Sequence, residues 1–234
     1  MLKAQSLSKR YEDGNLALDS LDLTVNEGET YCMLGANGAG KTTTINLFFN
    51  FIQPTGGSVS VGGIDTAVSP LEARRRMAYI SENVMLYGVL TARQNLRFFA
   101  DISGKPCSTD DCYKLLDRVG LDRGVINSKV KTFSKGMRQK LGLAIALLRD
   151  TPVIVMDEPT SGLDPKASKD FIDLLQSLKQ SGKTMLISTH DIHRVKDIAD
   201  RVGIMRQGKL VIENLNSEFN TESLQGLYIQ CMNA

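Results

Sequence analysis

The chain has 234 residues, of which 42% are hydrophobic, enough for one sizeable core or for a core with a satellite lobe. Its 28 basic and 26 acidic residues nearly balance, which argues against general affinity for nucleic acid or for an anionic membrane. The longest apolar stretch, residues 141–148, is shorter than the roughly 20 apolar residues that span a bilayer. Because the N-terminus also has no apolar signal region, we expect a cytoplasmic protein.

Short apolar runs alternate with helical patterns along the first half of the chain. Residues 30–34 predict a buried strand that leads into a glycine-rich loop, and residues 41–52 predict a helix that ends before Pro54. Residues 59–61 predict a further strand. The stretch from Thr91 to Leu148 has a helical pattern, which opens with the capping-box spacing of Thr91 and Gln94. The breaks in this pattern lie at Gly104, Pro106, Gly120 and Gly124.

Three more runs of strand length follow, at residues 153–156, 184–187 and 202–205. Asp164 before Pro165 predicts the start of a helix that runs toward Ser181. Residues 206–209 predict a turn between two terminal strands, and the residues from Leu215 onward have only a weak pattern. Strands that alternate with helices predict an α/β core with a largely parallel sheet, into which the all-helical middle is inserted as a lobe.

The glycine-rich loop matches the complete phosphate-loop pattern between a strand and a helix: Gly35-Ala36-Asn37-Gly38-Ala39-Gly40-Lys41-Thr42. Its backbone N–H groups and the helix N-terminus are suited to surround phosphates. We expect Lys41 to reach the β- and γ-phosphates, Thr42 to ligate Mg²⁺ and Thr43 to touch the α-phosphate. The alternative is an ordinary glycine-rich turn, which is disfavoured because every required position is filled.

Two acids, Asp157 and Glu158, end the run that begins at Val153. A carboxylate at the end of a parallel strand points into the ligand crevice. We expect Asp157 to hold Mg²⁺, commonly through water, and Glu158 to orient or deprotonate an attacking water. The alternative is a pair of solvated acids in a loop, which Pro159 makes plausible.

A Ser-x-Gly turn precedes the long helical pattern that ends at Leu148: Phe133-Ser134-Lys135-Gly136-Met137. Ser134 is a good N-cap. The segment between Arg123 and Arg149 contains no acid, and its cations cluster around the helix start, where each opposes the helix dipole by roughly 0.3–1 kcal/mol when exposed. The cluster either faces an anion or is a solvated basic face.

The order of these motifs resembles the ABC ATPase family, and the resemblance covers about residues 2–212. In that family the acids are followed by Pro-Thr-Ser-Gly-Leu-Asp, as in residues 159–164 here. The resemblance implies an α/β P-loop NTPase (RecA-like) core with a mostly parallel sheet, at about 1–82 and 150–212, and a small antiparallel β subdomain. It also implies an inserted α-helical subdomain at about 83–149 and a tail at 213–234, in a single ABC ATPase domain that binds ATP and Mg²⁺.

The resemblance also implies roles for single residues. His190 matches the switch histidine that contacts the γ-phosphate, and Tyr11 matches the aromatic residue that stacks on adenine. His193 has no such support, and a metal pair of His190 and His193 is disfavoured. Two copies of the chain are expected to pair head to tail, so that the signature residues Ser134 and Gly136 close on the partner's phosphate loop. Asp164, in the motif after the acids, is also expected to bind nucleotide.

Two positions depart from the family pattern. Lys135 replaces the first glycine of the signature, a version that resembles the exporter class whose permease is a separate chain. Glu82 stands where the family has Gln, and an ionised Glu only accepts hydrogen bonds. Glu82 either approaches Mg²⁺ or a bound water, beside Thr42 and Asp157, or lies in an exposed loop.

The resemblance implies an ATP-hydrolysing subunit of an ABC transporter, bound to an integral membrane permease on the inner face of the cell membrane and engaged in export. The alternative is a soluble ABC ATPase in a non-transport assembly such as iron–sulfur cluster biogenesis. Nucleic-acid partners are not expected, because the charge is nearly neutral and the single cassette carries no long heptads. The four cysteines form no Cys-x-x-Cys pair, so neither zinc nor a disulfide framework is expected.

Overall fold

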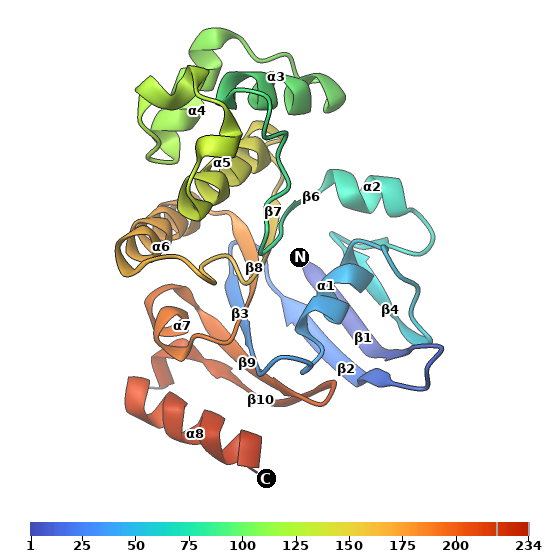
Figure 1. The fold of residues 1–234 in the computed structure, drawn as a ribbon. Coiled ribbons are helices and arrows are strands. Elements are labelled where there is room, and N and C mark those ends of the chain that lie inside the picture. The colour runs from blue at the N-terminus through green and yellow to red at the C-terminus, as the bar shows by residue number, and fades with distance from the viewer. Residues whose placement is uncertain (219, 234) are drawn as a thin grey trace.

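The computed structural model describes residues 1–218 and 220–233, which form a large and a small β-sheet with helices around them (Figure 1). The large sheet has the strand order β10-β9-β3-β8-β7-β6. Its neighbours pair in parallel except for β10, which is antiparallel to β9. The strands are β3 (Thr30–Leu34), β6 (Met77–Ile80), β7 (Val153–Asp157), β8 (Thr184–Thr189), β9 (Arg201–Arg206) and β10 (Lys209–Leu215). The predicted α/β core with a largely parallel sheet is confirmed.

The small sheet is antiparallel and has the order β2-β1-β4-β5. Its strands are β1 (Leu2–Arg10), β2 (Leu16–Val25), β4 (Gly56–Val61) and β5 (Ile64–Asp65). Helix α1 (Lys41–Phe48) packs between this sheet and one face of the large sheet, where Ile45 and Phe48 join the core with Tyr31 and Met33 of β3. The alternate β3 residues Cys32 and Leu34 enter the core on the opposite face, so both faces of this strand are buried.

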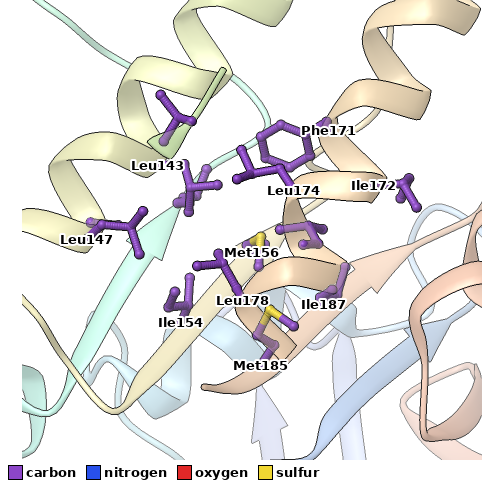
Figure 2. Close-up of a cluster of buried hydrophobic side chains, with 14 of the residues drawn as sticks. Leu143, Leu147, Ile154, Met156, Phe171, Ile172, Leu174, Leu178, Met185 and Ile187 are labelled. Carbon is purple, nitrogen blue, oxygen red and sulfur yellow. The ribbon is translucent and has the colours of Figure 1, made fainter. Parts of the chain in front are cut away.

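The opposite face of the large sheet is covered by helices α5 (Lys135–Leu148) and α6 (Pro165–Gln180). Figure 2 shows the contact: leucines from α5 and the apolar face of α6 meet above β7 and β8. Full burial of each such side chain contributes about 1.5–3 kcal/mol. The residues labelled there are Leu143, Leu147, Ile154, Met156, Phe171, Ile172, Leu174, Leu178, Met185 and Ile187.

The helical lobe gathers at one end of the molecule, where α3 (Ala92–Ile102) and α4 (Thr109–Arg118) pack on α5 (Figure 1). The predicted capping box is confirmed: Gln94 N donates to Thr91 Oγ1 at 3.2 Å, and Thr91 N donates to Gln94 Oε1 at 2.8 Å. The short 3₁₀ segments Arg123–Asn127 and Val130–Thr132 lead from α4 to α5. The exact bounds of the lobe as a subdomain stay a prediction.

Helix α1 ends at Phe48, so the expected extent to residue 52 is wrong. Asn50 adopts a left-handed backbone with φ 51°, and Phe51 N donates to Asn46 O at 2.9 Å. This is the hydrogen bond of a Schellman C-cap, in which Asn is accepted in place of Gly.

The remaining helices contact an edge strand or interior strands of the large sheet. They are α2 (Pro70–Arg75), α7 (Ile192–Ile198) and α8 (Thr221–Asn233). Helix α8 lies in the segment whose sequence pattern is weak, and it packs on α7 and β9 through Leu224, while Arg206 Nη1 donates to Cys231 O at 2.9 Å. Within residues 1–218 and 220–233, no helix combines the length and the apolarity needed to cross a membrane.

Candidate nucleotide site

The phosphate loop runs from the end of β3 to the start of α1, and its glycines are required by close contacts. A Cβ on Gly35 would lie 2.6 Å from Met205 O. Gly40 has φ 105°, and a Cβ there would lie 2.8 Å from Ala17 O. Side chains at either position would therefore push the loop away from β2 and β9, and only glycine lets it curl back over the first turn of α1.

Lys41 is buried at the centre of this loop. Its ammonium group donates to Gly35 O at 2.6 Å and lies 3.3 Å from Ala36 O, so the loop's own carbonyls hold the charge in place. The same Nζ lies 3.3 Å from Glu158 Oε1 at the end of β7. The ammonium is thus held between the loop and the acidic strand end.

Asp157 is the last residue of β7 and is buried beside α1. Its Oδ2 accepts a hydrogen bond from Thr42 Oγ1 at 2.9 Å, and its Oδ1 accepts one from the hydroxyl of Ser188 on β8. Burial, with Asp157 nearby, raises the pKa of Tyr79 to about 12, so this phenol stays neutral beside the site.

The pairing of Thr42 with Asp157 fits a Mg²⁺ site. A hydroxyl and a carboxylate are hard oxygen donors, and Mg²⁺ is usually bound through one or two protein groups, substrate phosphates and water. The part of the chain that the structure describes has no cluster of three or more His, Cys, Asp and Glu. A site completed by phosphates needs no such cluster.

Glu158 follows β7 with a left-handed backbone, φ 47°. Such strained positions cluster at functional sites when the surroundings hold them, and here Glu158 N donates to Ser188 O at 3.1 Å. Glu158 Oε2 lies 2.9 Å from His190 Nδ1 and accepts from His190 N at 3.3 Å. Glu158 Oε1 is buried and accepts no hydrogen bond from any residue that the structure describes, although the Lys41 ammonium lies 3.3 Å away as an ion-pair partner.

These groups share a cleft of about 250 Å³. Tyr11 lies at its rim, with its hydroxyl 3.5 Å from Thr43 Oγ1, and the residue is about one-third exposed. His190 joins the site through its contact with Glu158. The cleft is lined by Tyr11, Asn15, Ala17, Ala36, Asn37, Gly38, Ala39, Gly40, Lys41, Thr42, Thr43, Glu82, Asp157 and Glu158.

Sequence reasoning did not single out Ser188, which holds both acids. It stands two residues before His190 at the end of a predicted strand. Ser188 places a hydroxyl at the carboxyl end of a strand that neighbours the acidic strand. This signal could have identified it, but only if the order of the strands had been known.

Ser134 and Asp164 act as helix caps outside the lining of this cleft. Met137 N donates to Ser134 Oγ at 3.2 Å, and Ala167 N donates to Asp164 Oδ1 at 2.9 Å. A Cβ on Gly136 would lie 3.1 Å from Ala167 Cβ, so this glycine permits the close approach of α5 to α6. None of the three predicted contacts is among the described residues that line the phosphate cleft.

Glu82 does line the cleft, but its carboxylate has partners within the chain. Its Oε1 accepts from Ser161 Oγ at 2.9 Å and lies 3.7 Å from Lys135 Nζ. Its predicted role as a metal ligand stays a prediction.

Comparison with known proteins matches residues 18–161 to the family described as ABC transporter. The chain is 33% identical to the ABC transporter ATP-binding protein NatA of Bacillus subtilis, over 98% of this chain and 97% of that protein. It is 34% identical to the lantibiotic transport ATP-binding protein SrtF of Streptococcus pyogenes, over 96% and 98% of the two chains.

Among solved structures, a dimeric, post-hydrolysis state of the ATP-binding cassette MJ0796 bound to ADP and Pi superposes with a TM-score of 0.83. The match covers 92% of this chain and 99% of that one at 27% identity. Since the family match spans more than half of the chain and the relatives extend over nearly all of it, the chain belongs to the ABC transporter family, as one of its ATP-binding cassettes.

Proposed function

We propose that this chain hydrolyses ATP to ADP and phosphate at two sites shared between paired cassettes, and that it drives export through a separate membrane permease. The observation that supports hydrolysis best is Glu158 Oε1, a buried acceptor beside the phosphate loop to which none of the described residues donates a hydrogen bond. A buried acceptor left open at a ligand cleft is suited to receive a hydrogen bond from a substrate or a water.

Nucleotide binding is assigned to the loop, Lys41 and Tyr11. The loop amides and the N-terminus of α1 favour anionic phosphates, and Lys41 carries the charge that the β- and γ-phosphates require. The exposed part of the Tyr11 ring offers a surface for adenine. Thr42 and Asp157 would hold Mg²⁺, which when bound neutralises charge on the phosphates.

Glu158 is the proposed general base. Its Oε2 is occupied by His190, which fixes the carboxylate, while Oε1 stays available to orient and deprotonate a water. His190 is about half exposed, so one side of its ring is open toward a terminal phosphate. Lys41 supplies positive charge beside the carboxylate, where negative charge develops on the phosphoryl group.

The second half of each site is assigned to a second copy of this chain, in a head-to-tail pair. Ser134 is exposed at the start of α5, where helix amides and basic side chains favour an anion. The similarity to a dimeric cassette bound to ADP and Pi supports this arrangement. In it, Ser134, Gly136 and Asp164 would face the partner's nucleotide.

The permease is assigned to the surface that follows Glu82. Met85 and Val89 are 84% and 73% exposed, and Tyr87 packs edge-to-face on Phe98 of α3. Exposed apolar groups gathered on one surface mark interaction sites. Docking there would hold the chain on the inner face of the cell membrane, and Lys135 in the signature, which resembles the exporter class, supports the direction.

Transport is tested by purifying the tagged chain from membranes together with the protein encoded beside it, followed by reconstitution in inside-out vesicles. We expect a multi-helix membrane protein to co-purify, and ATP-driven uptake of its substrate that Glu158→Gln abolishes. Co-purification with cluster-assembly proteins instead, and no membrane partner, would refute the transport function in favour of a non-transport assembly.

A further inference from the structure

The two residues that depart from the family pattern lie in contact with each other. Lys135 Nζ lies 3.7 Å from Glu82 Oε1, although 53 positions separate them in the numbering of the chain. Ser161 Oγ donates to the same oxygen at 2.9 Å. The loop after β6, the start of α5 and the loop after β7 therefore meet at one carboxylate.

A second contact holds the backbone of the same loop to α5. Gln139 is buried, and its Nε2 donates to Glu82 O at 2.8 Å and lies 3.4 Å from Ser81 O. Gln139 stands one helical turn after Lys135, so both side chains reach the loop from the same face of α5. The position of Glu82 is thus determined through its main chain as well as its side chain.

The loop after β7 also lies close to Lys135. A Cβ on Gly162 would lie 3.2 Å from Lys135 Nζ, so the lysine lies directly over the turn that follows Ser161. Glu82 and Lys135 are 45% and 29% exposed, and water weakens an isolated pair of this kind. The hydrogen bond from Ser161 to the Glu82 carboxylate and that from Gln139 to the Glu82 backbone hold Glu82 in place more firmly than the ion pair alone would.

We propose that Glu82 is a positioning residue that ties the signature turn, through Lys135, to the loop that contains Ser161, in place of a metal ligand. This inference rests on the proposed function, because the link has a functional consequence only if the ATP sites are shared between two chains. Glu82 lines the chain's own phosphate cleft, whereas Ser134, next to Lys135, is assigned to the partner's nucleotide. The cluster therefore joins the halves of the two ATP sites that one chain contributes.

A double-mutant cycle tests the link. Glu82→Gln keeps the shape and a hydrogen-bond acceptor but removes the charge, and Lys135→Met keeps the stem and removes the ammonium. Amide hydrogen exchange in the nucleotide-free protein reports on Met137 N and Ser161 N, which donate to Ser134 Oγ and Glu158 O. We expect each single variant to speed exchange about 2- to 5-fold, and the double variant to go no further than the larger single effect.

Lys140→Met is the matched control, because Lys140 lies on the same helix but pairs with Asp170 at 3.6 Å. Combined with Glu82→Gln, it should give effects that multiply. As a second readout, the Mg²⁺ concentration for half-maximal ATP hydrolysis should change less than 2-fold in Glu82→Gln.

If the effects of Glu82→Gln and Lys135→Met on the amide exchange rate multiplied in the double variant, the proposal would be overturned. The proposal would also be overturned if Glu82→Gln raised the Mg²⁺ concentration for half-maximal hydrolysis 10-fold or more, and by the same factor with Lys135 present or replaced by Met. This is the result expected of a metal ligand. A wild-type protein without ATP hydrolysis would refute the proposed function instead, while the exchange cycle would still report on the link.

Discussion

Replacing Glu158 by Gln separates nucleotide binding from hydrolysis in this site. The amide keeps the shape of the side chain and an acceptor for His190 N, but it can no longer accept a proton from water. We expect turnover to fall 10²–10⁴-fold, which corresponds to about 3–5 kcal/mol of activation free energy. We expect ATP binding to be retained, because a carboxylate that would repel the terminal phosphate has been removed, and we expect an ATP-bound dimer to accumulate.

The structure also bounds the effect on stability. Unit charges 3.3 Å apart, as for Lys41 Nζ and Glu158 Oε1, attract by about 5 kcal/mol at an effective dielectric constant of 20. The cost of removing both charges from water offsets much of this attraction, and Lys41 keeps its bonds to the loop carbonyls. We expect a net loss of about 1–2 kcal/mol, which lowers the Tm by roughly 2–8 °C for a chain of this length.

Phosphate release under steady-state conditions measures the turnover, and light scattering with ATP measures the dimer. Glu72→Gln makes the same chemical change on the exposed face of α2 and should leave both unchanged. Wild-type turnover in Glu158→Gln would refute the assignment of the base. A slow variant that binds no ATP would show that Glu158 acts through the integrity of the phosphate loop.

Ser134→Arg should abolish hydrolysis, because a bulky cation replaces the cap that is proposed to face the partner's nucleotide; mixed with Lys41→Ala chains, it should recover at most one intact site per dimer. Removal of Mg²⁺ by EDTA should stop hydrolysis, and Asp157→Asn should raise the Mg²⁺ concentration for half-maximal rate by roughly 10–100-fold. Burial, together with the neighbouring Cys112, raises the pKa of Cys107 to about 12, so its alkylation at pH 7.5 should be roughly 10³-fold slower than that of an ordinary thiol and should rise with pH.

Different observations would contradict each of these. The control for bulk and charge is Ser103→Arg, which lies at the exposed end of α3. If Ser134→Arg hydrolysed ATP as fast as Ser103→Arg, the proposal of a shared site would be refuted. An unchanged Mg²⁺ dependence in Asp157→Asn would exclude its metal role. For Cys107, mass spectrometry of iodoacetamide labelling would show rapid reaction at pH 7.5 if the thiol were not held in its protonated form.

Local chemistry could be predicted from the sequence because it is encoded within a few neighbouring residues. The caps at Thr91, Ser134 and Asp164 are where the patterns place them, since an N-cap depends on one side chain and the next three amides. The glycine pattern of the phosphate loop is also readable within eight residues, although the contacts that require Gly35 and Gly40, with Met205 and Ala17, come from distant segments. The end of α1 at Phe48 was missed because Asn50, without a glycine, takes the left-handed C-cap position.

The contacts that connect these segments were decided only by the tertiary structure. Thr42 and Asp157 lie 115 positions apart, and their hydrogen bond exists because β3, β8 and β7 are neighbours in the sheet in an order unlike that of the chain. The same strand order places Ser188 beside Asp157. The sequence by itself determined which side chains could do chemistry, while the packing of helices on a parallel sheet decided which of them meet, because spacing along a chain carries no record of strand order.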